Sequence, residues 1–287
     1  MQTVRMDLSS VSVYYEEYGE GRPFVSIHGF YPDHRLMKGC MEPVLSRRPG
    51  WRRIYFDLPG MGKTPAEPRI VGSDQMLDVV MDFIDRLIPD DNFVLAGESY
   101  GGYLARGVIK RIPDRVDGLF LLCPMVVAQR EKRTLAEHKV ISEDVDFVSS
   151  LDDPGRLEFT STVVVQNRHT WKRVLDEVIQ GLRLADDKFL TRLYNEGYAF
   201  KEDLDSAPRV YSRPTLLALG RQDSSVGYRD AWSLIELFPR GTFVVLDRAG
   251  HNLQIEQETL FNALVNEWLD RVEEHNQRQS ESRHTSR

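Results

Sequence analysis

The stretch Gly97-Glu98-Ser99-Tyr100-Gly101-Gly102 follows the apolar run Phe93-Val94-Leu95-Ala96 and precedes a helix-like segment, residues 103–112. A serine at the centre of G-x-S-x-G, between a strand and a helix, is typical of the sharp turn called a nucleophile elbow. The two outer glycines of this pattern have to be small because a Cβ at either place would strike the neighbouring strand or helix. The motif therefore predicts that the Ser99 hydroxyl is lifted above a sheet, where a substrate can reach it.

Strand and helix signals alternate on both sides of this motif. Apolar residues recur at helical spacing from Met76 to Ile88, with Ser73 as the expected N-cap. The other patterns predict strands over residues 11–15, 24–27, 54–56, 93–96, 119–122, 216–219 and 243–246, and helices over 230–238 and 258–272. The alternation predicts an α/β fold with a mostly parallel central sheet, helices on both faces and an antiparallel edge formed by the first two strands.

Residues 125–213 interrupt the alternation. This segment is largely charged and helical in pattern, with helices expected over 171–184 and 186–194 and a β-prone interruption at Val163-Val164-Val165. We expect a helical lid, because ligands of open α/β sheets bind beyond the carboxyl ends of the strands; the alternative is that the segment only covers the sheet. The expected division is a core of residues 1–124 and 214–274, a lid of 125–213, and a disordered tail of 275–287.

The composition excludes several classes of protein. With 287 residues, 41% hydrophobic and 28% charged, the chain suits one large globular α/β domain. A net charge of −7 without a basic cluster argues against a nucleic-acid partner. Cys40 and Cys123 have no metal-ligand spacing, and the first residues have no apolar leader, so we expect a reducing, cytoplasmic location and no membrane span.

Two later motifs supply partners for the serine. A serine hydroxyl is a poor nucleophile at neutral pH, so it needs a base within hydrogen-bond reach and an acid that orients the base. Asp223 follows one predicted strand in Gly220-Arg221-Gln222-Asp223, and His251 follows the next in Ala249-Gly250-His251. Because parallel strands end at the same edge, Ser99, Asp223 and His251 are predicted to converge there.

Five motifs in this order resemble those of the α/β-hydrolase superfamily, in the branch with a helical lid, over residues 11–272. They are His28-Gly29-Phe30, the Asp57-Leu58-Pro59-Gly60-Met61-Gly62 turn, the Ser99 elbow, the Asp223 segment and the His251 segment. The resemblance implies that Ser99 attacks a carbonyl, His251 is the base and Asp223 fixes its tautomer. It also implies an oxyanion hole made by the backbone N–H groups of Phe30 and Tyr100.

Several polar residues near these motifs are expected to have roles outside the triad. His28 is expected to brace the oxyanion loop, and Asp57 to be structural. Glu98, beside the nucleophile, is expected to make a structural contact or a salt bridge; the alternative is that it binds a substrate terminus together with Glu196 and Glu202, as in aminopeptidase and carboxypeptidase relatives.

The reaction is better defined than the substrate. We expect hydrolysis of a small to medium carboxylic ester, lactone or thioester, with no cofactor and no metal. Two alternatives keep the triad, a C–C bond hydrolase and a proline-iminopeptidase-like amide hydrolase; a third is a small-molecule receptor with slow turnover. Candidate substrate-binding residues, mostly apolar or aromatic, are Tyr31, His34, Met125, Trp171, Tyr194 and Tyr198.

Overall fold

An eight-stranded sheet forms the centre of the computed structural model, which describes residues 2–204 and 210–285. The strand order is β1-β2-β4-β3-β5-β6-β9-β10. Strand β2 runs antiparallel to both of its neighbours, and all the other pairs are parallel. The strands of this sheet are β1 (Gln2–Asp7), β2 (Ser12–Tyr18), β3 (Arg22–Ile27), β4 (Trp51–Phe56), β5 (Phe93–Glu98), β6 (Val116–Leu122), β9 (Thr215–Gly220) and β10 (Gly241–Leu246).

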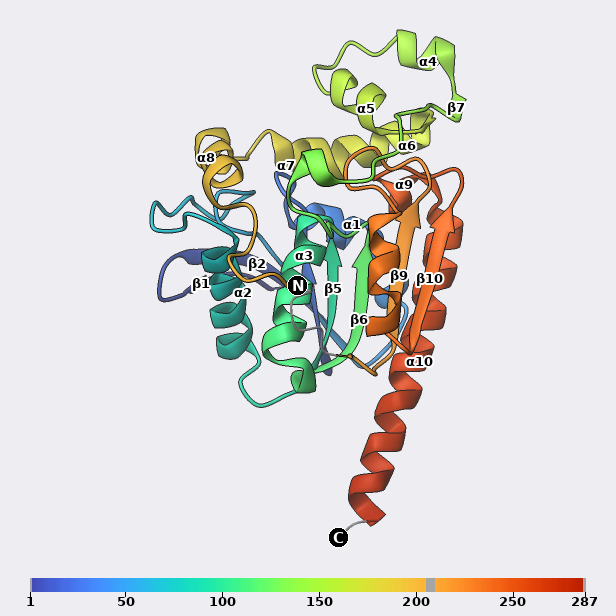
Figure 1. Cartoon of the computed structure of the whole chain (residues 1–287). Helices are drawn as coiled ribbons and strands as arrows, with labels where there is room; N and C mark the ends of the chain where they lie inside the picture. The colour runs from blue at the N-terminus through green and yellow to red at the C-terminus, as the bar shows by residue number, and fades with distance from the viewer. Residues whose placement is uncertain (1, 205–209, 286–287) are drawn as a thin grey trace.

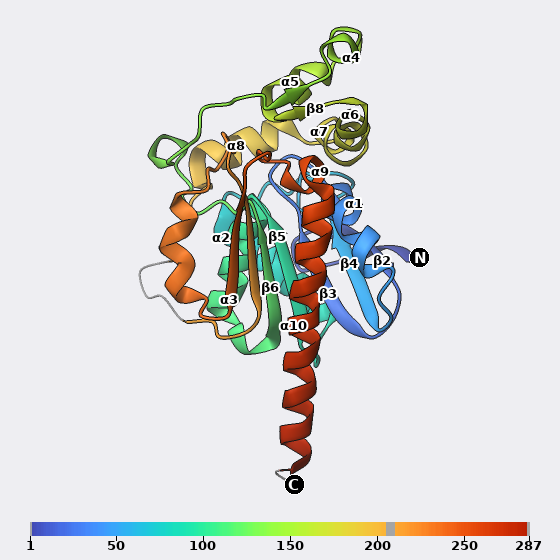
Figure 2. The ribbon, with the colours of Figure 1, turned by 90° about the vertical axis from the view of Figure 1, so that its right-hand side faces the viewer.

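Helices cover both faces of the sheet (Figures 1 and 2). Helices α1 and α10 pack together on one face, and α2 and α3 on the other. Every residue of β5, β6 and β9 is buried, as expected for central strands of a parallel sheet with two covered faces. The helices of this core are α1 (His34–Leu45), α2 (Ser73–Leu87), α3 (Tyr100–Arg111), η1 (Pro113–Arg115), η4 (Asp230–Leu237), α9 (Leu253–Glu256) and α10 (Glu258–Thr285).

The predicted α/β fold is confirmed, with three local corrections. The antiparallel edge is formed by β1 and β2, because β3 lies inside the sheet between two parallel neighbours. Gly72, not Ser73, is the N-cap of α2, and the Ser73 hydroxyl instead contacts the Tyr100 hydroxyl at 2.8 Å. Helix α10 continues to Thr285 through the expected disordered tail, since residues 275–285 contain no glycine or proline; residues 286–287 lie outside the described part.

Residues 125–213, here called the insertion, connect β6 to β9; 205–209 among them lie outside the described residues. Figure 1 shows the insertion above the carboxyl ends of β5, β6 and β9. This position is where ligands of α/β sheets bind. Its elements are η2 (Arg130–Lys132), β7 (Ser142–Glu143), α4 (Val145–Ser149), α5 (Arg156–Thr162), β8 (Val165–Gln166), α6 (Arg168–Val174), η3 (Leu175–Ile179), α7 (Gln180–Leu182) and α8 (Asp187–Gly197).

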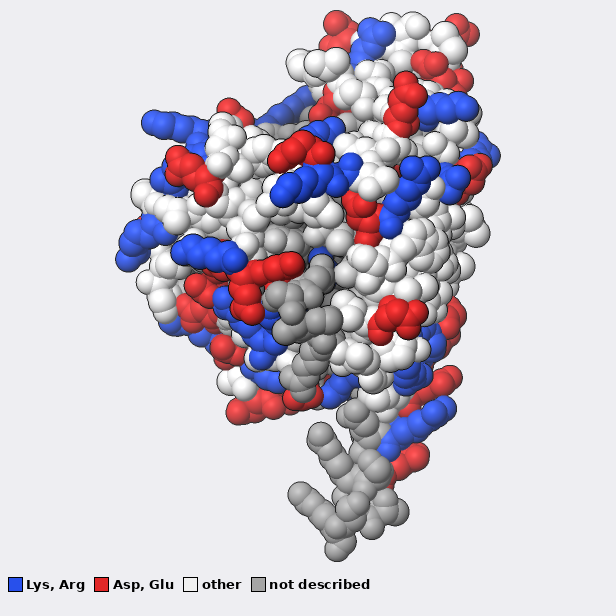
Figure 3. Space-filling model, in the orientation of Figure 1, with Lys and Arg blue, Asp and Glu red and all other residues white. Residues whose placement is uncertain are grey.

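The surface carries charges of both signs. On the face in Figure 3, Lys and Arg side chains are interspersed with Asp and Glu side chains. On this face, the described residues form no broad basic patch of the kind that binds a nucleic-acid backbone. Among the described residues, no helix is both long enough and apolar enough to cross a bilayer.

Candidate active site

The turn between β5 and α3 places Ser99 in a strained backbone conformation. Its φ is 52° and its ψ is −116°, a combination that non-glycine residues rarely adopt. A Cβ on Gly97 would clash with the Gly101 carbonyl, and a Cβ on Gly101 would clash with the Ile27 carbonyl. The surrounding strands therefore hold the elbow in its tight geometry, as the sequence predicted, with the Ser99 N–H donating to the Leu122 carbonyl at 3.0 Å.

The Asp223 and His251 side chains meet at the same edge of the sheet. Asp223 follows β9 and His251 follows β10, and Nδ1 of the imidazole lies 2.8 Å from Oδ2 of the carboxylate. The other oxygen, Oδ1, accepts from the N–H groups of Ser225 at 2.8 Å and Val226 at 3.0 Å. Burial favours the neutral form of Asp223, but the charge and hydrogen bond of His251 hold its pKa below the usual value.

His251 has a second carboxylate neighbour. Its Nε2 atom lies 3.2 Å from Oε1 of Glu98, the residue that precedes the nucleophile. Burial lowers the pKa of His251, but Asp223 and Glu98 outweigh burial and raise it to about 9. Burial raises the pKa of Glu98 to about 7, against the opposing charge of His251. The sequence reading of Glu98 allowed for a salt bridge, and the structure shows that its partner is His251.

The loop after β3 carries Phe30, one of the two residues predicted to form an oxyanion hole. His28 is buried and braces this loop: its Nδ1 donates to the Gly29 carbonyl at 2.7 Å, and its Nε2 accepts from the Leu58 N–H at 3.0 Å. The bracing role expected for His28 is therefore seen. Tyr100 is the first residue of α3, so its N–H has no partner within the helix and is available to a developing negative charge. The ring of Phe30 packs edge-on against Tyr100 at 5.1 Å between centroids.

A cavity of about 520 Å³ lies over Ser99 and His251. The core contributes the loop after β3, the Ser99 turn and the loops that carry Val226 and His251, and the insertion closes the other side. Of the predicted substrate-binding residues, Tyr31 and Tyr198 line it. Its other lining residues include Phe30, Leu36, Glu98, Arg130, Arg133, Glu158, Val178, Leu182, Val226 and Asn252. Arg133 and Glu158 were missed because no motif marks them within the charged insertion.

Four predicted substrate-binding residues lie outside the lining of this cavity. His34 is buried in a network with Asp57 and Glu16, which uses both ring nitrogens. Met125 is fully buried beneath Arg133, whose guanidinium contacts its sulfur at 3.1 Å. Trp171 packs edge-on against Phe159. Tyr194 is 41% exposed and packs against Tyr198 from the far side.

The acidic residues considered for reading a substrate terminus are dispersed. Glu202 is exposed and pairs with Lys110 at 2.9 Å, and Glu196 is exposed on α8. Of these three glutamates, only Glu98 lines the cavity that Ser99 also lines. The geometry therefore gives no support to an aminopeptidase-like cluster.

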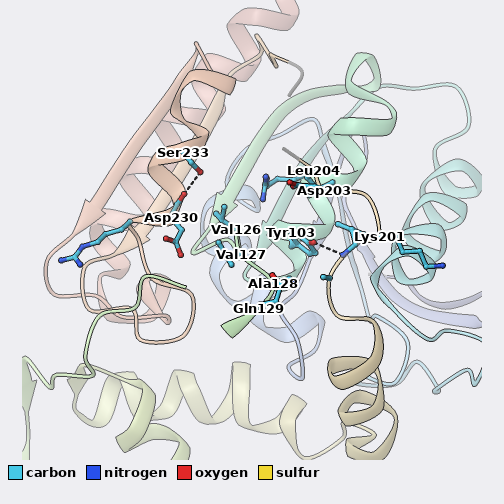
Figure 4. Close-up of a pocket in the computed structure, with 14 residues that line it drawn as sticks. Tyr103, Val126, Val127, Ala128, Gln129, Lys201, Asp203, Leu204, Asp230 and Ser233 are labelled. Carbon is cyan, nitrogen blue, oxygen red and sulfur yellow. Dashed lines mark hydrogen bonds between the residues drawn. The ribbon is translucent and has the colours of Figure 1, made fainter. Parts of the chain in front are cut away.

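A larger cavity of about 670 Å³ lies on the other side of the β6–insertion connection (Figure 4). Tyr103, Val126 and Leu204 contribute to its walls, and its polar groups include Lys201 and Asp230. Neither Ser99 nor His251 is among its described lining residues. The lining includes Leu204, the last residue before the undescribed residues 205–209. The reactive groups therefore point to the smaller cavity as the site of chemistry.

The fold and this site define a member of the alpha/beta hydrolase family: the family profile matches residues 24–264, and the chain belongs to that family. It is similar to an alpha/beta superfamily hydrolase from Oenococcus oeni, with 30% identity, a TM-score of 0.87, and coverage of 94% of this chain and 99% of the other. It is also 28% identical to the AB hydrolase superfamily protein YisY of Bacillus subtilis, covering 89% and 94% of the two chains. A pimeloyl-[acyl-carrier protein] methyl ester esterase of Legionella pneumophila is 26% identical, covering 90% and 100%. The protein is thus a hydrolase with esterase relatives.

Proposed function

We propose that this hydrolase cleaves a carboxylic ester through an acyl-enzyme on Ser99, with His251 as base and Asp223 as its orienting acid. The observation that carries the proposal is the 2.8 Å contact between Asp223 and His251 at the cavity that Ser99 also lines. Three features support acyl transfer: a nucleophile at a strained elbow, a base that lines the same cavity, and an acid hydrogen-bonded to that base.

In the first half-reaction, Ser99 Oγ attacks the ester carbonyl carbon as its proton passes to Nε2 of His251. Asp223 holds Nδ1–H and stabilises the imidazolium that forms. The N–H groups of Phe30 and Tyr100 donate to the oxyanion; losing one such donor typically costs about 2.7–4 kcal/mol of transition-state stabilisation. The proton on Nε2 then goes to the departing alcohol, and water repeats the sequence to release the acid.

The cavity supports a small to medium acyl or aryl group. Its volume is about 520 Å³, and Phe30, Tyr31 and Leu36 on the core side face Val178 and Leu182 of the insertion. We infer that the insertion acts as a lid that selects the substrate, because it closes the cavity opposite the nucleophile. The name of the Legionella relative, a methyl ester esterase, is compatible with this class. The two unpaired buried cysteines suit a reducing, cytoplasmic location.

Ser99→Ala tests the proposal. The variant is expected to lose covalent labelling by a fluorophosphonate probe and about six orders of magnitude in kcat on an ester substrate. Ser225→Ala is the matched control, because Ser225 lines the same cavity but has no base beside it; it should keep its labelling. Labelling that persists in Ser99→Ala, or that is lost only in Ser225→Ala, contradicts the assignment. A panel of esters graded by acyl length, with lactones, ring-cleavage products and aminoacyl amides, then separates the ester reading from the alternatives.

A further inference from the structure

Glu98 is a buried carboxylate whose position relative to the base is unusual for a triad. It is the last residue of β5 and is 3% exposed. Its carboxylate accepts from the Gly29 N–H, and a Cβ on Gly29 would clash with its Oε2 atom, so the oxyanion loop packs directly on it. The side chain is therefore fixed between that loop and His251.

Glu98 lies beside the imidazole nitrogen that has to accept the serine proton, whereas an orienting acid binds the opposite nitrogen. Asp223 already takes Nδ1 of His251, and Glu98 lies 3.2 Å from Nε2, the atom that has to accept the Ser99 proton. An imidazole with a carboxylate on each nitrogen can satisfy both only when both nitrogens carry a proton. In that form the ring has no lone pair for the serine.

We propose that Glu98 is a positioning residue that competes with Ser99 for Nε2 of His251, so that the resting site holds a protonated base between two carboxylates. This inference rests on the proposed function of Ser99 and His251. Before attack, the Nε2 proton is released to solvent, which leaves a neutral imidazole. Ser99 then gives its own proton to the freed Nε2. Glu98 thus sets the pH at which the nucleophile becomes reactive.

The other charged groups around the pair do not replace this contact. Arg133 opposes a positive charge on His251, but its guanidinium donates to the carbonyls of Val127, Ala128 and Ser225. Glu158, on α5, lines the same cavity, but the structure records no ion pair between it and His251, unlike the 3.2 Å pair of Glu98. The remaining titratable groups that face the pair are Asp223, Cys40, Cys123 and Tyr198; burial raises the pKa of the thiols and of the phenol, so these three are neutral near pH 7.

The test is the pH dependence of Ser99 phosphonylation by a fluorophosphonate, measured as a second-order rate constant from pH 5.5 to 10. The wild-type rate is expected to rise with a midpoint above pH 8. Glu98→Gln keeps the side-chain size and an acceptor for Gly29 but removes the charge, so its midpoint should fall by at least about one pH unit. Near pH 8, where Glu98 is ionised in the wild type and His251 is still largely protonated, the variant should then react about fivefold faster than the wild type.

Glu158→Gln is the matched control, since it removes a carboxylate from the same cavity without removing the 3.2 Å contact; its midpoint should move much less. An unshifted midpoint in Glu98→Gln, or a uniform loss of rate at every pH, overturns the inference and leaves the proposed function intact. If Glu98→Gln does not fold, the wild-type midpoint decides alone, and a value below pH 7 overturns the inference. Absence of Ser99 labelling at every pH overturns the proposed function as well.

Discussion

Two histidines in this protein lie between pairs of carboxylates, and they have opposite surroundings. His34 is 2% exposed, with Nδ1 2.7 Å from Asp57 and Nε2 3.1 Å from Glu16. His251 has Nδ1 2.8 Å from Asp223 and Nε2 3.2 Å from Glu98, with 20% of its side chain exposed to the cavity. Both rings have a pKa raised to about 9, in each case by carboxylates that outweigh burial.

The two sites differ in which other groups surround the histidine ring. Glu16 also accepts from Lys38 at 2.7 Å and from the Tyr18 hydroxyl at 2.8 Å, so the His34 network is closed and joins β2, α1 and the turn after β4. The His251 site is open on one side, where the nucleophile and the cavity lie. The same charge pattern therefore serves structure in the closed network and reactivity in the open one. A raised histidine pKa alone does not identify a catalytic base.

The largest expected effect is a loss of catalytic rate, which should distinguish His251 from His34. His251→Gln should lower kcat by about six orders of magnitude, as loss of the base does in a serine protease, because Ser99 then has no proton acceptor. Its unfolding temperature should also fall when measured below pH 9, because the variant loses the stabilisation that the imidazolium gains from its two carboxylates. Ester hydrolysis and thermal unfolding, measured on one preparation, check both statements. A variant that keeps a hundredth of the wild-type rate would show that another group accepts the proton.

The next effect concerns the orienting acids. Asp223→Asn should lower kcat by about 10⁴-fold, because Glu98 then becomes the only carboxylate on the ring and favours a proton on Nε2, the wrong tautomer for a base. Asp57→Asn is its counterpart in the closed network and should change the rate per folded molecule by less than tenfold. Equal losses of rate in the two variants, corrected for the folded fraction, would contradict the distinction between the sites.

The closed network should dominate stability. Its carboxylates and imidazolium are buried together, and removing one member leaves the others without compensation, which typically costs about 3–5 kcal/mol. His34→Gln is therefore expected to lower the free energy of unfolding by that amount in urea titrations, while fluorophosphonate labelling of Ser99 persists in the folded fraction. An unfolding free energy within 1 kcal/mol of the wild type, on the scale of a surface pair, would contradict a structural role for His34.

Stability should also fall as the pH rises from 7.5 to 8.5, a window in which the two histidines make the largest contribution. A histidine whose pKa is raised from 6.5 to about 9 contributes its full stability below pH 6.5 and loses it as the pH rises through 9. Between pH 7.5 and 8.5 each ring should therefore remove about 1.4 kcal/mol per pH unit from the unfolding free energy. Glu98 and Glu256 have a pKa raised to about 7. Their effect on the pH dependence of stability is therefore mostly complete below pH 7.5.

His34→Gln and His251→Gln should each remove one of these two contributions, so each variant should show about half of the wild-type slope. Equilibrium urea unfolding at pH 7.5, 8.0 and 8.5 measures this directly. A slope unchanged in either variant would show that the corresponding ring is not held as an imidazolium in the folded protein.

The sequence predicted the open site better than the closed one. Ser99, Asp223 and His251 follow strand patterns and stand in short motifs, so local pattern and strand parallelism together place them at one edge. No motif marks His34 or Glu16. The two residues meet because β2 pairs antiparallel with β4. Strand propensity alone does not predict that pairing. The insertion was predicted as helical, and Tyr198 within it was predicted to bind substrate and lines the cavity. Arg133 and Glu158 were not predicted, since they are ordinary charged residues until the chain folds over the sheet.

The smallest expected effect concerns the dependence of the open site on the insertion. Glu256 is buried, and its two oxygens accept from the N–H groups of Val164, in the insertion, and Gly250, beside the base, each at 2.6 Å. Glu256→Gln places an amide NH₂ against one of these donors, so one hydrogen bond is lost at a cost of about 1–3 kcal/mol. We expect faster hydrogen exchange at the Val164 and Gly250 amides and a decrease in kcat of less than tenfold.

The same variant should leave the closed network unchanged, because none of its residues contacts Glu256 in the described structure. Exchange at the His34 amide, which donates to Asp57 at 2.8 Å, is the internal reference. Glu258→Gln, two residues along and paired with the exposed His169, is the matched control. If exchange at Gly250 rises no more than exchange at His34, then the insertion does not hold the base in place, and the position of His251 depends on β9 and β10 alone.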